Sequence, residues 1–371
     1  MRRLNKNLFI TLPLTLLSAS TFAEINSDYE VSSIMLTADH NESLGVPMAF
    51  YANGRMQSKL VVSVAFSNSN GASVAVSDDE LRDALSLYLK NNDTSLVKDK
   101  DCRYERNCWG YTYNENDYEH QISNIYRSNE NKPSSRVLST ASNRLSAWVY
   151  GKEIAQYRQV CAKIKFNDGR IYDSCAFPYD ENAIYQGVQE RIYNASDFAE
   201  IGEGELVWQD AGDGFYFEKA EMRNFYITPI DTSVTLTKVA MDNLEESNND
   251  KVFLNDKWLG CYDDCPNGFQ SVKGYIFEPG PERTVEDEYM YSTAAGEGRV
   301  ATWTVNQQLR SLTLSQLLYT DGGAQGNEVQ KEYRFTAFDQ YGNKAPLKLA
   351  YPKSGFSDQE WDYTKWSLVN Q

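Results

Sequence analysis

The sequence predicts an all-β protein made of two or three antiparallel β-sandwich domains, with short helical turns and disulfide bridges. Three observations lead to this prediction. Short segments of alternating apolar and polar residues are separated by turns rich in Gly, Asn and Asp. Apolar residues at helical spacing are scarce. The six cysteines fall into three pairs whose members are close in the sequence, as expected for local disulfides.

The first 23 residues are expected to be a secretory signal peptide. Basic residues at positions 2, 3 and 6 precede an apolar run over 8–17, and the Thr-Phe-Ala of 21–23 fits a cleavage site before Glu24. The residue directly after that site is Glu24 and not a cysteine, which argues against a lipoprotein anchor. We therefore expect a periplasmic, secreted or cell-surface protein, because disulfides persist in those compartments.

The charge of the chain favours some partners and disfavours others. The sequence holds 36 Lys and Arg and 52 Asp and Glu, and three of the basic residues lie in 1–23, so the mature chain has 33 against 52 and a net charge of −19. Such a chain repels nucleic acid and anionic lipid, and no later run approaches the roughly 18 apolar residues of a membrane span. The expected partner is a protein or a glycan at the cell envelope.

Two elements are expected in the first hundred residues. Residues 56–66 alternate, with Met56, Val62 and Phe66 among the apolar set and Lys59 on the opposite face, which predicts a half-buried strand. Ser77 and Glu80 form a capping-box pattern that predicts a short helix. The alternating leucines at 85, 87 and 89 then predict that this helix leads into a strand.

Aromatic residues alternate along two segments that follow the helix. Cys102 and Cys108 are expected to close a small disulfide loop just before the first of these segments. The aromatic residues of the two segments are Trp109, Tyr111 and Tyr113, then Trp148 and Tyr150. If exposed, they form a platform for a glycan or a protein partner, and if buried, they are core. We take the exposed face as the candidate binding site, restrained by the adjoining disulfide loop.

A hairpin with a disulfide is expected over 160–177. Asn167-Asp168-Gly169 is a strong turn signal between two alternating runs. A three-residue loop with Gly169 in the left-handed region places Lys163 opposite Asp173 and Cys161 opposite Cys175. A two-residue loop would slip the register by one and leave the cysteines diagonal. The three-residue loop is therefore the expected register.

Further hairpins are expected over 205–218, 288–305 and 332–351. Residues 183–193 fit a helix nearly as well as a strand. Cys261 and Cys265 are expected to form the third disulfide. The sequence Ala-Phe-Asp-Gln-Tyr-Gly-Asn at 337–343 resembles the strand-turn-strand element of bacterial immunoglobulin-like domains, and this resemblance implies that the sandwiches are immunoglobulin-like.

Domain boundaries are expected in two polar stretches. The stretch 127–136 contains Pro133 and many polar residues, so the N-terminal sandwich is expected to span 24–130 and a C-terminal β-rich region 131–371. A second polar stretch, 243–251, divides the latter into two sandwiches or forms a long surface loop.

No catalytic residues are assigned, because the chain lacks the common nucleophile, phosphate-binding and zinc-site motifs. No metal cofactor is expected either. Calcium remains an alternative at acidic turns that contain Asp210, Asp213, Asp263 and Asp264. The predicted function is binding, adhesion or assembly without catalysis. The alternative is a carbohydrate-active enzyme that uses a pair of carboxylates on a β scaffold, since such chemistry needs no local motif.

Overall fold

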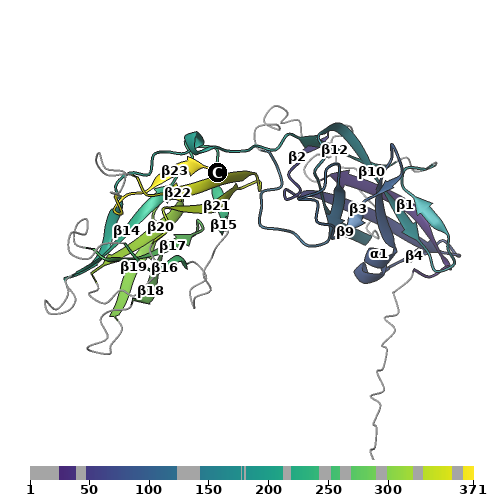
Figure 1. Cartoon of the computed structure of the whole chain (residues 1–371). Coiled ribbons are helices and arrows are strands. Elements are labelled where there is room, and N and C mark those ends of the chain that lie inside the picture. The colour runs from purple at the N-terminus through teal and green to yellow at the C-terminus, as the bar shows by residue number, and fades with distance from the viewer. Residues whose placement is uncertain are drawn as a thin grey trace, which may run out of the picture.

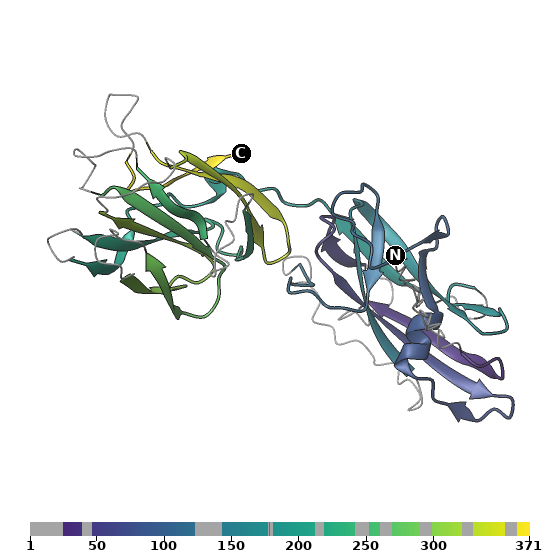
Figure 2. The same cartoon turned by 60° about the horizontal axis from the view of Figure 1, so that its bottom comes forward.

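The computed structural model describes residues 25–38, 47–122, 143–176, 178, 181–211, 219–241, 252–259, 269–289, 299–320, 329–352 and 362–371. The expected signal peptide and the pair Cys261 and Cys265 lie outside these ranges. Two views show two lobes rich in strands, the first purple to teal and the second teal to yellow (Figures 1 and 2). The chain is nearly all β, as predicted, with a single α-helix among the described residues.

The first domain consists of two facing sheets. One has the order β1 (Tyr29–Ala38), β3 (Ser58–Asn68), β9 (Asn143–Gly151), β8 (Trp109–Thr112) and β7 (Val97–Lys98), with β4 (Ser73–Val74) beside β3. The other has the order β2 (Met48–Tyr51), β12 (Ala183–Val188), β10 (Ala155–Lys165), β5 (Leu85–Leu89) and β6 (Thr94–Ser95), with β11 (Ile171–Asp173) beside β10. All strand pairs are antiparallel except β2–β12 and β7–β8. Residues 183–188, for which the sequence allowed a helix or a strand, form strand β12. It lies between the edge strand β2 and strand β10.

The expected boundary near residue 130 does not divide two domains. Strands from before and after it pair in the same sheets: β3 with β9, β5 with β10 and β2 with β12. A single core of buried residues, which includes Phe50, Phe66, Phe166 and Tyr185, fills the space between these sheets. The domain therefore extends to about β12. A loop within a domain and a linker between domains can have the same polar composition. Strand pairing, which the composition does not reveal, distinguishes the two.

The elements predicted from short sequence patterns form as expected in this domain. Helix α1 (Asp78–Ala84) begins with both hydrogen bonds of the Ser77–Glu80 capping box and leads directly into β5, as predicted. The hairpin of β10 and β11 has the predicted register, with Lys163 opposite Asp173. Gly169 has φ +86°, and the Phe166 amide donates to the Arg170 carbonyl to close the three-residue loop. These features depend on residues a few positions apart.

Both disulfides that fall in the described ranges have the predicted partners. Cys161 and Cys175 are linked with a Cα–Cα distance of 5.7 Å, and Cys102 and Cys108 with 5.4 Å. Strand β3 departs from its prediction in one respect, because Gln57 and Ser63 on its supposed outer side are also buried. The Gln57 amide donates to the Asn114 carbonyl and accepts from the Asn116 amide, so the 114–116 segment covers that face.

The second domain is a stack of three layers. The middle sheet has the order β13 (Glu205–Asp210), β14 (Ala220–Ile227), β20 (Leu312–Tyr319), β17 (Ser271–Phe277) and β16 (Val252–Trp258). One face packs on the sheet β15 (Leu236–Met241), β21 (Glu332–Asp339), β22 (Lys344–Ala350) and β23 (Ser367–Asn370). The other face is covered by the hairpin of β18 (Arg283–Tyr289) and β19 (Arg299–Val305). Strands on both sides of 243–251 share one core, so this stretch does not separate two sandwiches.

Polar side chains attach the outer hairpin to the middle sheet. The buried Lys273 ammonium lies 2.6 Å from the Asp287 carboxylate, which also accepts a hydrogen bond from the Tyr275 hydroxyl. The Trp303 indole donates to the Ser315 hydroxyl at 3.0 Å. Because each buried polar group has a partner, this interface gains specificity without an unsatisfied charge.

Candidate functional site at the junction of the two domains

The turn between β21 and β22 is built around one carboxylate, that of Asp339. Its Oδ1 accepts hydrogen bonds from the backbone amides of Tyr341 at 2.9 Å and Asn343 at 2.8 Å. Gly342 has φ +76°, a conformation that favours glycine, and its amide donates to the Asp339 carbonyl. The short sequence Asp-Gln-Tyr-Gly-Asn therefore folds into a rigid turn because its own aspartate satisfies its backbone.

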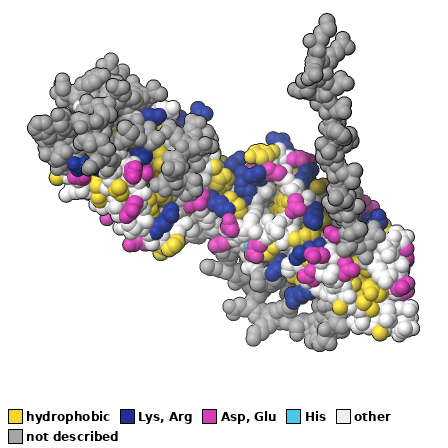
Figure 3. Space-filling view, turned by 90° about the horizontal axis from the view of Figure 1, so that it is seen from below, with side chains coloured by type: hydrophobic (Ala, Val, Ile, Leu, Met, Phe, Trp, Pro, Cys, Tyr) yellow, Lys and Arg dark blue, Asp and Glu magenta, His cyan; other side chains and the backbone are white. Residues whose placement is uncertain are grey.

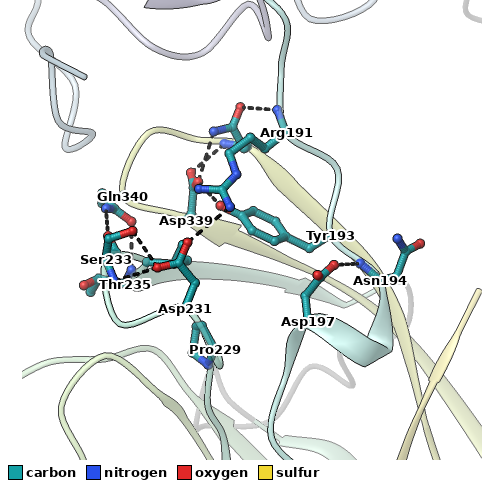
Figure 4. Close-up of polar contacts among 12 residues, drawn as sticks. Arg191, Tyr193, Asn194, Asp197, Pro229, Asp231, Ser233, Thr235, Asp339 and Gln340 are labelled. Atoms are coloured by element: carbon teal, nitrogen blue, oxygen red, sulfur yellow. Dashed lines mark hydrogen bonds and ion pairs between the residues drawn. The ribbon is translucent and has the colours of Figure 1, made fainter. Parts of the chain in front are cut away.

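The second oxygen of Asp339 connects the turn to the interdomain linker, residues 189–194 between β12 and the second domain, as Figure 4 shows. Its Oδ2 accepts from the Tyr193 hydroxyl at 2.7 Å and from the Asn343 side-chain amide at 3.0 Å. Asp339 is 1% exposed, and burial raises the pKa of its carboxyl while these hydrogen bonds oppose the rise. Four donors thus converge on one buried carboxylate at the junction.

Asn53 of the first domain completes the junction. Its side-chain amide donates to the Tyr341 carbonyl at 2.9 Å and to the Asn343 Oδ1 at 3.2 Å. Its own Oδ1 accepts from the backbone amides of Arg55 and Met56. Asn53 and Asn343 are both fully buried, so these bonds join the two domains away from solvent. We call the set Asn53, Arg191, Tyr193, Asp339 and Asn343 the junction cluster.

Arg191 and Tyr193 of the linker both bind to the second domain. The Arg191 backbone amide donates to the Asn343 Oδ1, and the Arg191 guanidinium lies 3.3 Å from the Asp231 carboxylate (Figure 4). The Tyr193 amide donates to the Lys344 carbonyl at 3.1 Å. The Asp231 carboxylate also accepts from Ser233, and these hydrogen bonds hold the pKa of Asp231 below its ordinary value. The linker therefore pairs with the start of β22 through a single parallel bridge, between Ile192 and Lys344.

A second contact between the domains comes from the segment 114–120. The Glu119 amide donates to the Gln340 carbonyl at 2.7 Å, and the Lys238 ammonium lies 2.8 Å from the Asp117 carboxylate. The Arg55 guanidinium packs on the Phe338 ring at 4.8 Å. A side chain at Gly342 would come within 2.8 Å of Arg55, so the close approach requires glycine at this position.

A groove of about 620 Å³ opens beside this contact. Its wall consists of residues from the first domain together with Lys238 of β15 in the second. The charged and aromatic residues that line it are Arg55, Asp99, Lys100, Asp101, Arg103, Glu115, Tyr118, Tyr150 and Lys238. On the face drawn in Figure 3, Lys and Arg side chains gather on the first domain beside the junction. Four cations and three carboxylates line the groove, so its lining is less acidic than the chain as a whole, whose net charge is −16.

The predicted aromatic platform is not exposed, which corrects the expectation made from alternation. Trp109 and Tyr111 are 5% and 4% exposed and belong to the core between the sheets. Tyr113 is partly buried against the same core, and its hydroxyl donates to the Arg82 carbonyl. The opposite sheet packs on the inner face of β8. Alternation along a strand shows which residues share a face, but it does not show whether another sheet packs on that face.

Trp148 and Tyr150 lie on the other face of the sheet and are also buried. The His120 ring covers Trp148 at a centroid distance of 4.2 Å. Tyr150 packs on the Cys102–Cys108 disulfide over Gly110, and its hydroxyl donates to the Lys100 carbonyl. Of the five predicted binding residues, Tyr150 is the one that also lines the groove.

Of the four candidate calcium ligands, the structure describes only Asp210. The Asp210 carboxylate lies 2.7 Å from the Arg299 guanidinium and accepts from the Tyr289 hydroxyl, so its charge is balanced by protein groups. Asp213, Asp263 and Asp264 lie outside the described residues. Within the described ranges, no group of three or more His, Cys, Asp or Glu side chains is placed to hold a metal ion.

The junction cluster and Arg55 were not among the residues predicted from the sequence. The turn at 339–343 was recognised as a turn, but its contact with another domain depends on tertiary structure. The comparisons with protein-family models and with curated proteins return no match for this chain. No helix in the described part is long and apolar enough to cross a membrane.

Proposed function

We propose that this protein acts by binding or assembly at the bacterial cell envelope, and that recognition takes place where its two domains meet. The observation that carries the proposal is the buried junction cluster, in which Asp339 receives four hydrogen bonds and Asn53 links the domains. A joint of this kind fixes Lys238, the residue that the second domain contributes to the adjoining groove, relative to the wall formed by the first domain. Preorganised walls lower the entropy lost when a partner binds.

The proposed location is the periplasm or the cell surface. It is supported by two disulfides, which persist in oxidising compartments, and by the signal peptide expected from the sequence. We also propose that the domains are immunoglobulin-like. The stacked antiparallel sheets and the turn at 339–343 support that assignment. The proposed partner is a protein or a glycan of the envelope.

Asp101, one of three carboxylates that line the groove, does not fit the role of the general acid in the carboxylate-based enzyme. A glycosidase needs one carboxyl whose pKa is raised so that it can donate a proton. Asp101 lines the groove, and its hydrogen bonds with the Arg103 guanidinium, at 2.8 and 2.6 Å, lower its pKa to about 2. This shift is opposite to the one a general acid requires.

The test is a binding and hydrolysis assay on envelope material. The chain from Glu24 onward, purified with its disulfides, is sedimented with peptidoglycan sacculi, outer-membrane vesicles and surface polysaccharide. We expect co-sedimentation with at least one fraction and no new reducing ends. Asn53→Ala should weaken this retention, because it removes the amide that joins the domains.

Three results would overturn the proposal. They are release of reducing ends that is lost on replacing one acidic residue, absence of retention on every fraction, and retention that is unchanged in Asn53→Ala. Fractionation of cells that express the full chain tests the location separately. Recovery of the protein in the cytoplasm would contradict it.

A further inference from the structure

Three of the four cations in the groove are neutralised by carboxylates. The pairs are Lys100 with Glu105 at 2.8 Å, Arg103 with Asp101 at 2.6 Å, and Lys238 with Asp117 at 2.8 Å. Each of these side chains therefore has a structural partner and little capacity left to attract a ligand. Arg55 is the exception.

Arg55 is held in the groove without a carboxylate partner among the described residues. Asn53 Oδ1 accepts its backbone amide, the Phe338 ring lies against its guanidinium, and Gly342 lies close to its Cβ. Its guanidinium makes one long hydrogen bond, from Nη1 to the Asn53 carbonyl at 3.5 Å. Since a guanidinium carries five N–H groups, most of its donors remain available.

The surroundings of Arg55 make this charge unusual. Burial lowers the pKa of its guanidinium, and the neighbouring positive charge of Arg103 acts in the same direction. Glu190 attracts Arg55 at a distance beyond that of an ion pair, and its own Oε2 is buried without a hydrogen-bond partner in the described structure. A partly desolvated guanidinium with spare donors binds a planar anion, and a carboxylate matches its geometry in a bidentate manner.

We propose that Arg55 anchors the carboxylate of an acidic saccharide in this groove, an inference that rests on the proposed binding function. The volume of about 620 Å³ lies within the usual range for small-ligand sites and can take a few sugar units. Tyr118 and Tyr150 contribute aromatic surface to the walls. An acidic peptide is less favoured, because extended peptides add to an open sheet edge and the groove walls include the loop residues 114–118.

Glu190 has a defined place in this proposal. Its carboxylate attracts the Arg55 guanidinium from outside the groove lining, so it reduces the positive potential that a ligand carboxylate meets at Arg55. Glu190→Gln should therefore strengthen binding, whereas Arg55→Gln should weaken it. Opposite effects from two neutralising substitutions are a signature that a general loss of folding does not produce.

The experiment is calorimetric titration of the disulfide-intact mature chain with trigalacturonate, in EDTA so that calcium bridging does not contribute. We expect Arg55→Gln to weaken binding at least about tenfold, because charge-assisted hydrogen bonds are lost. Arg55→Lys should recover part of the affinity, because it keeps the charge without the planar fork. The matched control is Arg334→Gln, since Arg334 is exposed on β21 in the second domain. It should change affinity by less than about twofold, because distant surface charges are screened.

The titration tests the Arg55 anchor separately from the proposed function, which retention on envelope fractions tests. Equal binding by Arg55→Gln and the parent chain would overturn the anchor. Triglutamate that binds as tightly as trigalacturonate would overturn the saccharide and favour an acidic peptide. If neither probe binds, the inference fails, while retention on envelope fractions still decides the proposed function. Thermal unfolding of each variant shows whether a lost affinity reflects lost folding.

Discussion

The hydrogen bond from Tyr193 to Asp339 offers a direct test of the junction. Tyr193→Phe removes one hydroxyl that donates at 2.7 Å to a carboxylate that is 1% exposed, and it leaves the ring in place. A hydrogen bond to a charged group contributes about 1.5–3 kcal/mol. Oδ2 keeps its bond from Asn343, so we expect the free energy of unfolding to fall by about 2 kcal/mol at neutral pH.

The loss should depend on pH in a defined direction. Burial raises the folded-state pKa of Asp339, and the Tyr193 hydrogen bond lowers it, so the variant has a still higher folded pKa than the parent. A raised carboxyl pKa means that stability falls as pH rises from the unfolded value, about 3.9, through the folded value. The variant loses more over this window. The difference between the two proteins should therefore be largest at neutral pH and shrink as Asp339 becomes protonated.

The assay is urea unfolding followed by tryptophan fluorescence, at neutral pH and at several acidic pH values. Tyr226→Phe is the matched control, because the Tyr226 hydroxyl also lies within hydrogen-bond distance of side-chain oxygens, those of Gln307 at 3.1 Å and Glu205 at 3.3 Å, but at an exposed site. The control should change stability by less than about 0.5 kcal/mol. Equal losses from the two substitutions, or a Tyr193→Phe loss that is independent of pH, would refute the role given to the buried carboxylate.

Two further predictions concern packing within each domain. In the first domain, Gly110→Ala should lower the free energy of unfolding by about 1–3 kcal/mol, because the added Cβ would lie 2.9 Å from the Tyr150 ring. The control Gly202→Ala has open space around the added Cβ and should be close to neutral. Comparable shifts in the thermal unfolding of the two variants would contradict the close approach of Tyr150 to Gly110. In the second, Lys273→Met should cost about 3 kcal/mol by removing the cationic partner of Asp287, which keeps its hydrogen bond from Tyr275. Adding Asp287→Leu should restore much of that loss in urea unfolding, and a further loss in the double variant would argue against the ion pair.

Several parts of the fold could be predicted from the sequence because they depend on neighbouring residues. The three-residue loop at 167–169 determines the register of its hairpin, and that register brings Cys161 and Cys175 together. The Ser77–Glu80 capping box begins the helix with its own side chains. Alternation likewise identified β3 and the pair β21–β22. The turn and the cap satisfy their own backbone groups, so remote residues are not required for them. Alternation identifies a strand but not its partners, and β3 pairs with β1 and with the distant β9.

The tertiary structure decided which faces are covered and which segments meet. Trp109 alternates with Tyr111 whether that face is a core or a surface, and the opposite sheet makes it a core. The polar stretch at 127–136 has the composition of a linker, yet the strands around it pair within one domain. Arg55 and Phe338 are far apart in the sequence and come into contact at the junction, where Asn53 hydrogen-bonds to the 339–343 turn. Burial and contact between distant residues depend on the whole chain, whereas turns and caps depend on a few positions.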